Sequence, residues 1–321
     1  MWLRARSFVV PSVFAALALS AQTGWSETKT IKIVVPNPPG ASTDILARLL
    51  AEQIGRTEGA TLVIENRPGA GNIVGSEAVA RAVPDGKTLL INANPFVIDP
   101  HLRRLSYDPL TSFEPVCYLA NSPMVIVVNS KSPYRLLDDL VSAARTKPSA
   151  LTVAAVGPGT AAHMAFATLK HAADVDMAFV PYPGNPPAIN ALMGEHVDAV
   201  ISSYPVVAEL VKSGKLRALA TTTRTRIEPL PDLPTVAEFG YKDYGADFWM
   251  GVVAPAKTPP EIVSKLSGWF TAAMKARETR AKLLAQALYP VGICGADFAG
   301  FIRKQFDDYG HLIRAFQIQV E

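Results

Sequence analysis

The sequence contains few of the residues from which metal centres and nucleophilic active sites are built. Only two of its 321 residues are cysteine and five are histidine. Two cysteines exclude a cysteine-rich zinc module, and no His-x-x-x-His or His-Glu-x-x-His spacing occurs. The nucleophile motif Gly-x-Ser-x-Gly is absent as well. We therefore expect a protein that is not an enzyme and that needs no metal and no cofactor.

Charge of one sign and long hydrophobic runs are also scarce. The formal net charge is +3, and removal of Arg4 and Arg6 with an N-terminal segment leaves +3 − 2 = +1. This is too little for a nucleic-acid surface, so we expect no nucleic-acid partner. The apolar run from Phe8 to Leu19 is shorter than the ~20 residues that span a bilayer.

That run has the features of a secretory signal. It follows two arginines and precedes small residues, which is the usual order of such a segment. We predict that residues 1–26 are a signal peptide, and that the mature protein is a periplasmic monomer. The remaining cysteines, Cys117 and Cys294, could pair in an oxidising compartment. Both lie in apolar surroundings, however, and we favour two unpaired buried thiols.

The stretch 31–54 shows the unit from which the chain is built. Residues 31–35 are all β-branched except Lys32 and predict a strand. Pro36 and Gly40 cannot extend this strand, so it must end before them. Apolar residues then recur at helical spacing as far as Ile54. We expect Ser42 or Thr43 to cap this helix and Asp44 to lie in its first turn, where a ligand contact is the second interpretation.

Four such units end in Gly/Pro-rich loops, at residues 36–43, 66–72, 157–160 and 181–187. Helix starts of this kind offer backbone amides to an anion. A chain of this length favours two domains, and strands that alternate with helices favour mostly parallel sheets. We therefore predict an α/β protein of two lobes with the loops facing a cleft.

Two features of these loops have competing interpretations. The segment Gly69-Ala70-Gly71-x-x-x-Gly75 resembles a dinucleotide-binding fingerprint but has the wrong spacing, and no acidic residue ends the following strand. His163, in the first turn of a helix, is either a hydrogen-bond donor at the cleft or a satisfied residue on a half-buried helix face.

Several motifs, taken together and in order, resemble the Bug family, the extracytoplasmic solute-binding proteins of tripartite tricarboxylate transporters. They are Val35-Pro36-x-x-Pro39-Gly40-x-x-Thr43-Asp44, Glu65-Asn66-Arg67-Pro68-Gly69-Ala70-Gly71, Pro84-Asp85-Gly86, Val180-Pro181-Tyr182-x-Gly184-x-x-Pro187-Ala188, Leu233-Pro234-Thr235-Val236-Ala237-Glu238 and Trp249-x-Gly251-x-x-Ala254-Pro255.

The resemblance implies a type II periplasmic-binding-protein fold with a hinge and a ligand cleft between two βα lobes. We place lobe 1 at residues 27–123 plus 250–321 and lobe 2 at residues 124–249. The family's ligands are small carboxylates. This chain has Asn37 where relatives carry an aromatic residue, and Ala41 and Asn72 where they carry glycine. An amide in place of a ring at the pocket mouth favours a more polar ligand or a different pose of the ligand.

The resemblance and the loop positions together give a set of expected ligand-binding residues. They are Asn37, Gly40, Ala41, Ser42, Thr43, Asp44, Ala70, Gly71, Asn94, Gly159, Thr160, His163 and Tyr204. The expected function is capture of a small carboxylate and its delivery to the membrane subunits of a tripartite tricarboxylate transporter. The alternative is a carboxylate sensor that presents its ligand-bound form to a signalling receptor.

Overall fold

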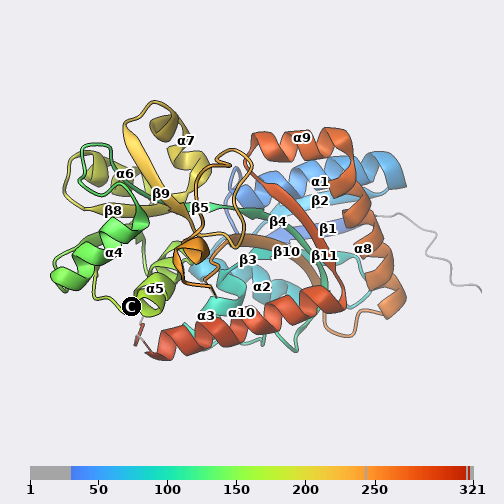
Figure 1. The fold of residues 1–321 in the computed structure, drawn as a ribbon. Helices are drawn as coiled ribbons and strands as arrows, with labels where there is room; N and C mark the ends of the chain where they lie inside the picture. Colours follow the sequence, from blue (N-terminus) through green and yellow to red (C-terminus); the bar gives the residue numbers. More distant parts are fainter. Residues whose placement is uncertain (1–29, 243, 316, 319–321) are drawn as a thin grey trace, which may run out of the picture.

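The computed structural model describes residues 30–242, 244–315 and 317–318. The predicted signal peptide, residues 1–26, lies outside the described residues. The described chain forms two sheets, each covered by helices on both faces (Figure 1). This is the two-lobed α/β fold predicted from the sequence.

The first sheet has six strands in the order β11-β4-β10-β3-β1-β2. Its strands are β1 (Thr30–Val35), β2 (Thr61–Asn66), β3 (Thr88–Ala93), β4 (Phe113–Ser122), β10 (Phe248–Pro255) and β11 (Tyr289–Cys294). Strand β1 is parallel to β2 and β3, whereas β10 is antiparallel to β3 and β4 and β11 is antiparallel to β4. This sheet is therefore mixed, and the prediction of mostly parallel sheets was wrong for it. The helices of this lobe are α1 (Ser42–Glu58), α2 (Ile73–Ala80), α3 (Pro95–Leu102), α8 (Pro260–Lys275), α9 (Arg277–Ala285) and α10 (Ala296–Ala315).

The second sheet has five strands in the order β7-β6-β8-β5-β9. They are β5 (Met124–Asn129), β6 (Thr152–Val156), β7 (Ala178–Tyr182), β8 (Ala199–Ser203) and β9 (Leu216–Thr221). Its helices are α4 (Leu137–Thr146), α5 (Ala161–Ala173), α6 (Asn185–Met193) and α7 (Tyr204–Lys212). The described chain also contains two short 3₁₀ helices, η1 (Ala70–Asn72), which lies between β2 and α2, and η2 (Val236–Phe239), which lies between β9 and β10.

Both sheets are buried on both faces, which explains their nearly continuous apolar strands. In β1, Ile33 packs with Leu50 of α1 and Phe270 of α8, while its neighbour Val34 packs on the opposite face with Phe298 of α10. The second sheet alternates in the same way: one face packs against α4 and α5 and the other against α6 and α7.

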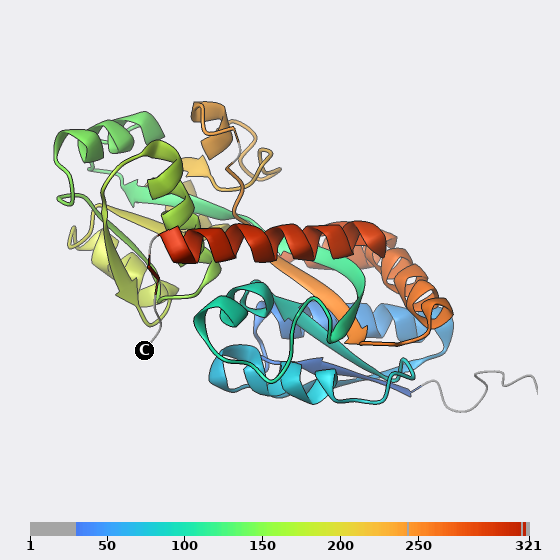
Figure 2. The ribbon, with the colours of Figure 1, turned by 90° about the horizontal axis from the view of Figure 1, so that it is seen from below.

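Two crossings of the backbone and one helix connect the lobes. The chain passes from β4 to β5 through Pro123 and returns into β10, and the two segments pair, with Phe248 opposite Ser122. Helix α10 runs from the first lobe to the second, where it contacts α5 (Figure 2). Hinge motion between the lobes must therefore be accommodated at these three places.

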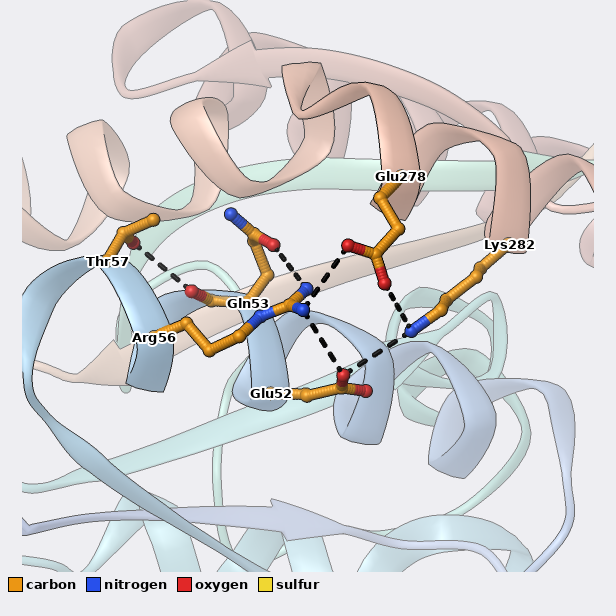
Figure 3. Close-up of polar contacts among 6 residues, drawn as sticks. All are labelled: Glu52, Gln53, Arg56, Thr57, Glu278 and Lys282. Atoms are coloured by element: carbon orange, nitrogen blue, oxygen red, sulfur yellow. Dashed lines mark hydrogen bonds and ion pairs between the residues drawn. The ribbon is translucent and has the colours of Figure 1, made fainter.

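A ring of alternating charges joins α1 to α9 on the surface of the first lobe (Figure 3). Arg56 lies 3.2 Å from Glu278, which lies 2.9 Å from Lys282, and Lys282 lies 3.3 Å from Glu52. Glu52 closes the ring at 3.7 Å from Arg56. The side chains are about half exposed, so each pair adds little stability.

The two cysteines form a disulfide, contrary to our expectation of two free thiols. Strand β11 pairs antiparallel with β4 and puts Cys294 directly opposite Cys117, with their Cα atoms 4.0 Å apart. Directly opposed residues of antiparallel strands are close enough to be bridged. The sequence does not indicate this pairing, because 177 residues separate the two cysteines.

Gly251 in β10 is expected to tolerate no side chain. A Cβ atom there would overlap the ring of Phe298 and lie 3.2 Å from the carbonyl oxygen of Cys117. We expect Gly251→Ala to lower the free energy of unfolding by about 1–3 kcal/mol in urea denaturation. Gly268 in α8 has nothing within 4 Å, so Gly268→Ala should instead raise it by about 0.5–1 kcal/mol. Equal effects of the two changes would contradict this packing argument.

Candidate functional site

A cavity of about 550 Å³ opens between the two lobes. The first lobe contributes the loop before α1 and the start of α3, and the second contributes the starts of α5 and α6. Met124 and Phe248, one on each crossing segment, complete the wall. The lining residues are Asn37, Ala41, Ser42, Thr43, Pro95, Met124, Val156, Thr160, Ala161, Ala162, Gly184, Asn185, Ser203 and Phe248.

Helix starts from both lobes face this cavity. Helix α1 begins at Ser42 and α5 at Ala161, and both residues line the wall. The first amides of a helix have no partner within the helix, and the helix dipole places partial positive charge there. Helix α6 offers fewer donors, because Pro186 and Pro187 in its first turn have no N–H group. The main donors for an anion are therefore the starts of α1 and α5.

Among the described residues that line the cavity, none has a charged side chain. Polar groups are instead hydroxyls and amides, and three of them form no hydrogen bond within the described part of the chain: the side chains of Ser42, Asn185 and Ser203. Apolar surface from Met124, Val156 and Phe248 fills the rest. Such a wall suits a ligand that brings its own negative charge to the helix starts and has an apolar middle.

The cap of α1 differs from the prediction. The residue at the N-cap position is Ala41, which has no capping side chain. The Thr43 hydroxyl donates instead to Asn37 Oδ1 at 2.8 Å, and Asn37 Nδ2 donates to Asn72 Oδ1 at 2.9 Å. Two of the three residues in which this chain departs from the Bug pattern, Asn37 and Asn72, are thus hydrogen-bonded to each other at the cavity edge.

Asp44 lies in the first turn of α1, as predicted, but is buried beside the cavity. Its carboxylate accepts hydrogen bonds from the Gly40 amide at 2.9 Å, Arg48 Nε at 3.0 Å and Asn66 Nδ2 at 2.9 Å. Burial raises the pKa of Asp44, but these hydrogen bonds, with the charge of Arg48, outweigh burial and hold the pKa below its usual value. Asp44 therefore fixes the loop, and the structure places it off the wall.

His163 has the equivalent place in the second lobe. It is the third residue of α5, as Asp44 is of α1, and its Nδ1 accepts from the Gly159 amide at 3.2 Å. Gly40 and Gly159 both have positive φ, 84° and 78°, which glycine adopts readily. The imidazole stacks on Phe179 with ring centroids 4.2 Å apart. Thr160 caps α5 by accepting from the His163 amide at 3.2 Å.

Burial lowers the pKa of His163 to about 4, so the ring is neutral near pH 7. In the unfolded chain a histidine titrates near pH 6.5. Between these pH values the unfolded state binds more protons, so stability must fall as the pH falls from about 6.5 to about 4. We expect the free energy of unfolding, measured by urea denaturation, to fall more between about pH 7 and about pH 5 for the wild type than for His163→Gln. Identical losses would contradict a buried, neutral imidazole.

Eight of the thirteen expected ligand residues do not line the cavity: Gly40, Asp44, Gly159 and His163, described above, and Asn94, Tyr204, Ala70 and Gly71. Asn94 and Tyr204 are almost fully buried in the lobes. Ala70 and Gly71 form η1, and Gly71 faces the carboxylate of Asp99, with 3.7 Å to a Cβ built on the glycine. Asn37, Ala41, Ser42, Thr43 and Thr160 do line it.

Nine lining residues were not among those expected. Gly184 and Asn185 lie in the loop 181–187 that was predicted to face the cleft, and Ala161 and Ala162 directly follow the loop 157–160. The helix-start pattern could have found these four. Pro95, Met124, Val156, Ser203 and Phe248 have no local signal, because tertiary pairing brings them to the wall.

The comparison with known proteins decides the family. Residues 46–318 match the model of the tripartite tricarboxylate transporter family receptor, TctC. The chain is 32% identical to protein BugT of Bordetella pertussis over 315 residues, or 96% of this chain and 97% of that protein. The chain belongs to this family. The resemblance to Bug proteins found in the motifs is thereby confirmed.

Two solved TctC-like structures contain ligands. Rpa4515 of Rhodopseudomonas palustris with adipate is 31% identical, has a TM-score of 0.75, and matches over 92% of this chain and 99% of its own. MatC from the same organism with bound malate is 27% identical, with a TM-score of 0.70, over 88% and 98%. The TctC family consists of solute-binding proteins and not of enzymes.

The described residues contain no group of three or more His, Cys, Asp or Glu side chains placed to hold a metal ion. Within the same ranges, no helix combines the length and apolar character needed to cross a bilayer.

Proposed function

We propose that this protein is a periplasmic binding protein that captures a small carboxylate between its lobes and delivers it to the membrane subunits of a tripartite tricarboxylate transporter. We further propose that residues 1–26 direct export, that the mature chain acts as a monomer, and that the lobes comprise residues 27–123 plus 250–321 and residues 124–249. The observation that carries the proposal is an interlobe cavity with helix starts on both sides and no charged side chain on its wall.

The energetics require more than helix dipoles. One helix start contributes about 0.3–1 kcal/mol to binding an anion, and up to about 2 kcal/mol when partly buried. A micromolar affinity needs about 8 kcal/mol. Direct hydrogen bonds from the free amides and from Ser42, Asn185 and Ser203 must therefore supply a large part, together with apolar burial when the lobes close.

Closure of the lobes gives the ligand-bound protein a conformation that a partner can distinguish from the free one. A ligand that contacts both lobes binds the closed state more tightly than the open one and shifts the population toward it. The membrane subunits then need only recognise the closed shape. The ligands of two relatives, adipate and malate, support a small dicarboxylate as the cargo.

A thermal-shift screen of the mature protein tests this proposal. The panel contains adipate, malate, succinate, citrate, glutamate and benzoate, with the amide of each acid as a neutral control. We expect at least one carboxylate to raise the melting temperature and its amide to have no effect. Equal shifts from acid and amide, or no shift from any acid, would contradict carboxylate capture. Turnover of a bound acid would contradict a function in binding alone.

A further inference from the structure

Beside the crossing between the lobes lies a buried side chain that makes three hydrogen bonds to two other segments. Asn94 follows β3 directly and is fully buried. Its Nδ2 donates to the carbonyl oxygen of Asp247 and to the hydroxyl of Tyr309, both at 2.9 Å. Its Oδ1 accepts from the Trp249 amide at 3.0 Å. Both amide hydrogens are therefore used inside the protein, and none remains for a ligand.

Two of these hydrogen bonds lie on either side of Phe248. Asp247 precedes Phe248 and Trp249 follows it, and Phe248 lines the cavity. The chain enters this segment from the second lobe, where the Ala246 amide donates to Thr222 at 2.9 Å. The change from contacts in the second lobe to contacts in the first thus occurs between Ala246 and Trp249. Asn94 holds the first-lobe side of that change.

The three hydrogen bonds of the Asn94 side chain form a clamp on its neighbours, and the third of them, to the Tyr309 hydroxyl, joins this clamp to α10. Tyr309 lies on the part of α10 that approaches the second lobe, and Leu312 and Ile313 pack in one apolar cluster with Met164 and Ala167 of α5. Asn94 is therefore linked to the returning backbone crossing and to the helix that spans both lobes (Figure 2).

The Trp249 ring packs against Tyr118, Phe298 and Phe301 of the first lobe, but the polar side-chain atoms of the returning segment contribute little to holding it in place. Asp247 Oδ1 and Trp249 Nε1 are buried and have no hydrogen-bond partner in the described structure. Asp247 Oδ2 has one long contact, 3.4 Å to Asn121 Nδ2. Besides the strand pairing of Phe248 and Trp249 with Ser122 and Asn121 of β4, the backbone bonds to Asn94 are the well-formed polar contacts that fix residues 247–249 to the first lobe.

We propose that Asn94 is a positioning residue that sets the hinge conformation in which Phe248 completes the cavity wall. Without this clamp the returning segment samples several conformations, and only a fraction of the molecules has a complete wall. The apparent association constant is then the intrinsic constant multiplied by that fraction. The consequence for affinity rests on the proposed function, whereas the consequence for the hinge does not.

Interlobe distances in the ligand-free protein test the hinge directly. Spin labels are attached at Val83→Cys in the first lobe and Leu136→Cys in the second, where both native side chains are exposed. We expect Asn94→Ser to broaden or shift the distance distribution, and Tyr309→Phe, which removes one of the three bonds, to do so less. If Asn94→Ser yields no folded protein, Tyr309→Phe decides alone. An unchanged distribution would overturn the proposal.

Asn92→Ser is the matched control. Asn92 is also a buried asparagine and lies two residues earlier, within β3, but its side chain contacts Ser76 of α2 at 2.8 Å and the adjacent Ala93 amide, all within the first lobe. This change should lower the melting temperature without altering the interlobe distances. The same distance change in Asn92→Ser and Asn94→Ser would show a general loss of stability and would overturn the assignment.

Calorimetry with adipate and malate as probes then tests the consequence for binding. For the probe that binds the wild type, we expect Asn94→Ser to weaken binding by about tenfold and Asn92→Ser to leave it unchanged. If neither probe binds while the distances change as expected, the proposed ligand class is wrong and the hinge assignment stands. If Asn94→Ser broadens the distances but binds equally well, the hinge does not set affinity.

Discussion

Replacing Ala162 by aspartate is expected to abolish carboxylate binding while leaving the fold intact. Ala162 lies in the first turn of α5 and lines the cavity. A carboxylate there is favourable for the helix itself, because it lies at the positive end of the dipole. It also occupies the place that we propose for the ligand's negative charge. Two like charges about 4 Å apart at an effective dielectric near 20 repel by about 4 kcal/mol, which weakens affinity by about a thousandfold.

The matched variant Ala162→Asn has nearly the same shape and no charge. It should weaken binding far less than Ala162→Asp, and both variants should melt at or above the wild-type temperature in the absence of ligand. Titration calorimetry with the best carboxylate of the screen gives the two affinities. If aspartate and asparagine weaken binding equally, the effect is steric. If Ala162→Asp still binds with wild-type affinity, the start of α5 does not face the ligand's charge.

The units that build the cavity were predictable from the sequence because their signals are local. Residues 31–35 lie in β1 and the apolar pattern after Asp44 lies in α1, as predicted. The loops 36–43 and 157–160 reach the cavity for the same reason: proline and glycine end a strand, and the next helix begins at the carboxyl end of a parallel strand. The sequence thus predicts three of the loops that line the cleft, whereas the fourth predicted loop, 66–72, contributes no residue to the wall.

The individual side chains that face the cavity were less predictable, because their direction depends on distant segments. Asn94 looks like a polar residue at a strand end, yet the returning β10 covers it completely. Phe248 reaches the wall because it pairs with Ser122 at the crossing. Neither environment exists until the two lobes have formed, so no local pattern indicates it.

Strand β11 escaped prediction for a different reason. It contains Pro290 and Gly292, and Gly292 has a φ of 79°. These residues normally argue against a strand, but proline is tolerated at a sheet edge, and β11 is the edge strand of its sheet. Because the strand was missed, the juxtaposition of Cys294 with Cys117 was missed with it.

Loss of that disulfide is the second change with a large expected effect. The bridge joins cysteines separated by 177 residues, and a cross-link across a loop of that order restricts the unfolded chain by about 4–5 kcal/mol. The total stability of a domain is about 5–15 kcal/mol, so the loss is a large share of it. We expect the double variant Cys117→Ser with Cys294→Ser to unfold at markedly lower urea concentration, and a reducing agent to have the same effect on the wild type. The reducing agent should have no further effect on the double variant.

The same bridge links stability to the proposed export. Cysteines form and keep a disulfide in an oxidising compartment such as the periplasm, whereas the cytosol keeps them reduced. Protein expressed without residues 1–26 should therefore carry two free thiols by mass spectrometry and unfold like the double variant, while exported protein should carry none. Ligand affinity should be equal in both forms, because neither Cys117 nor Cys294 lines the cavity. Equal urea midpoints for the bridged and the reduced protein would contradict a stabilising role for the disulfide and leave β11 held by its backbone pairing with β4 alone.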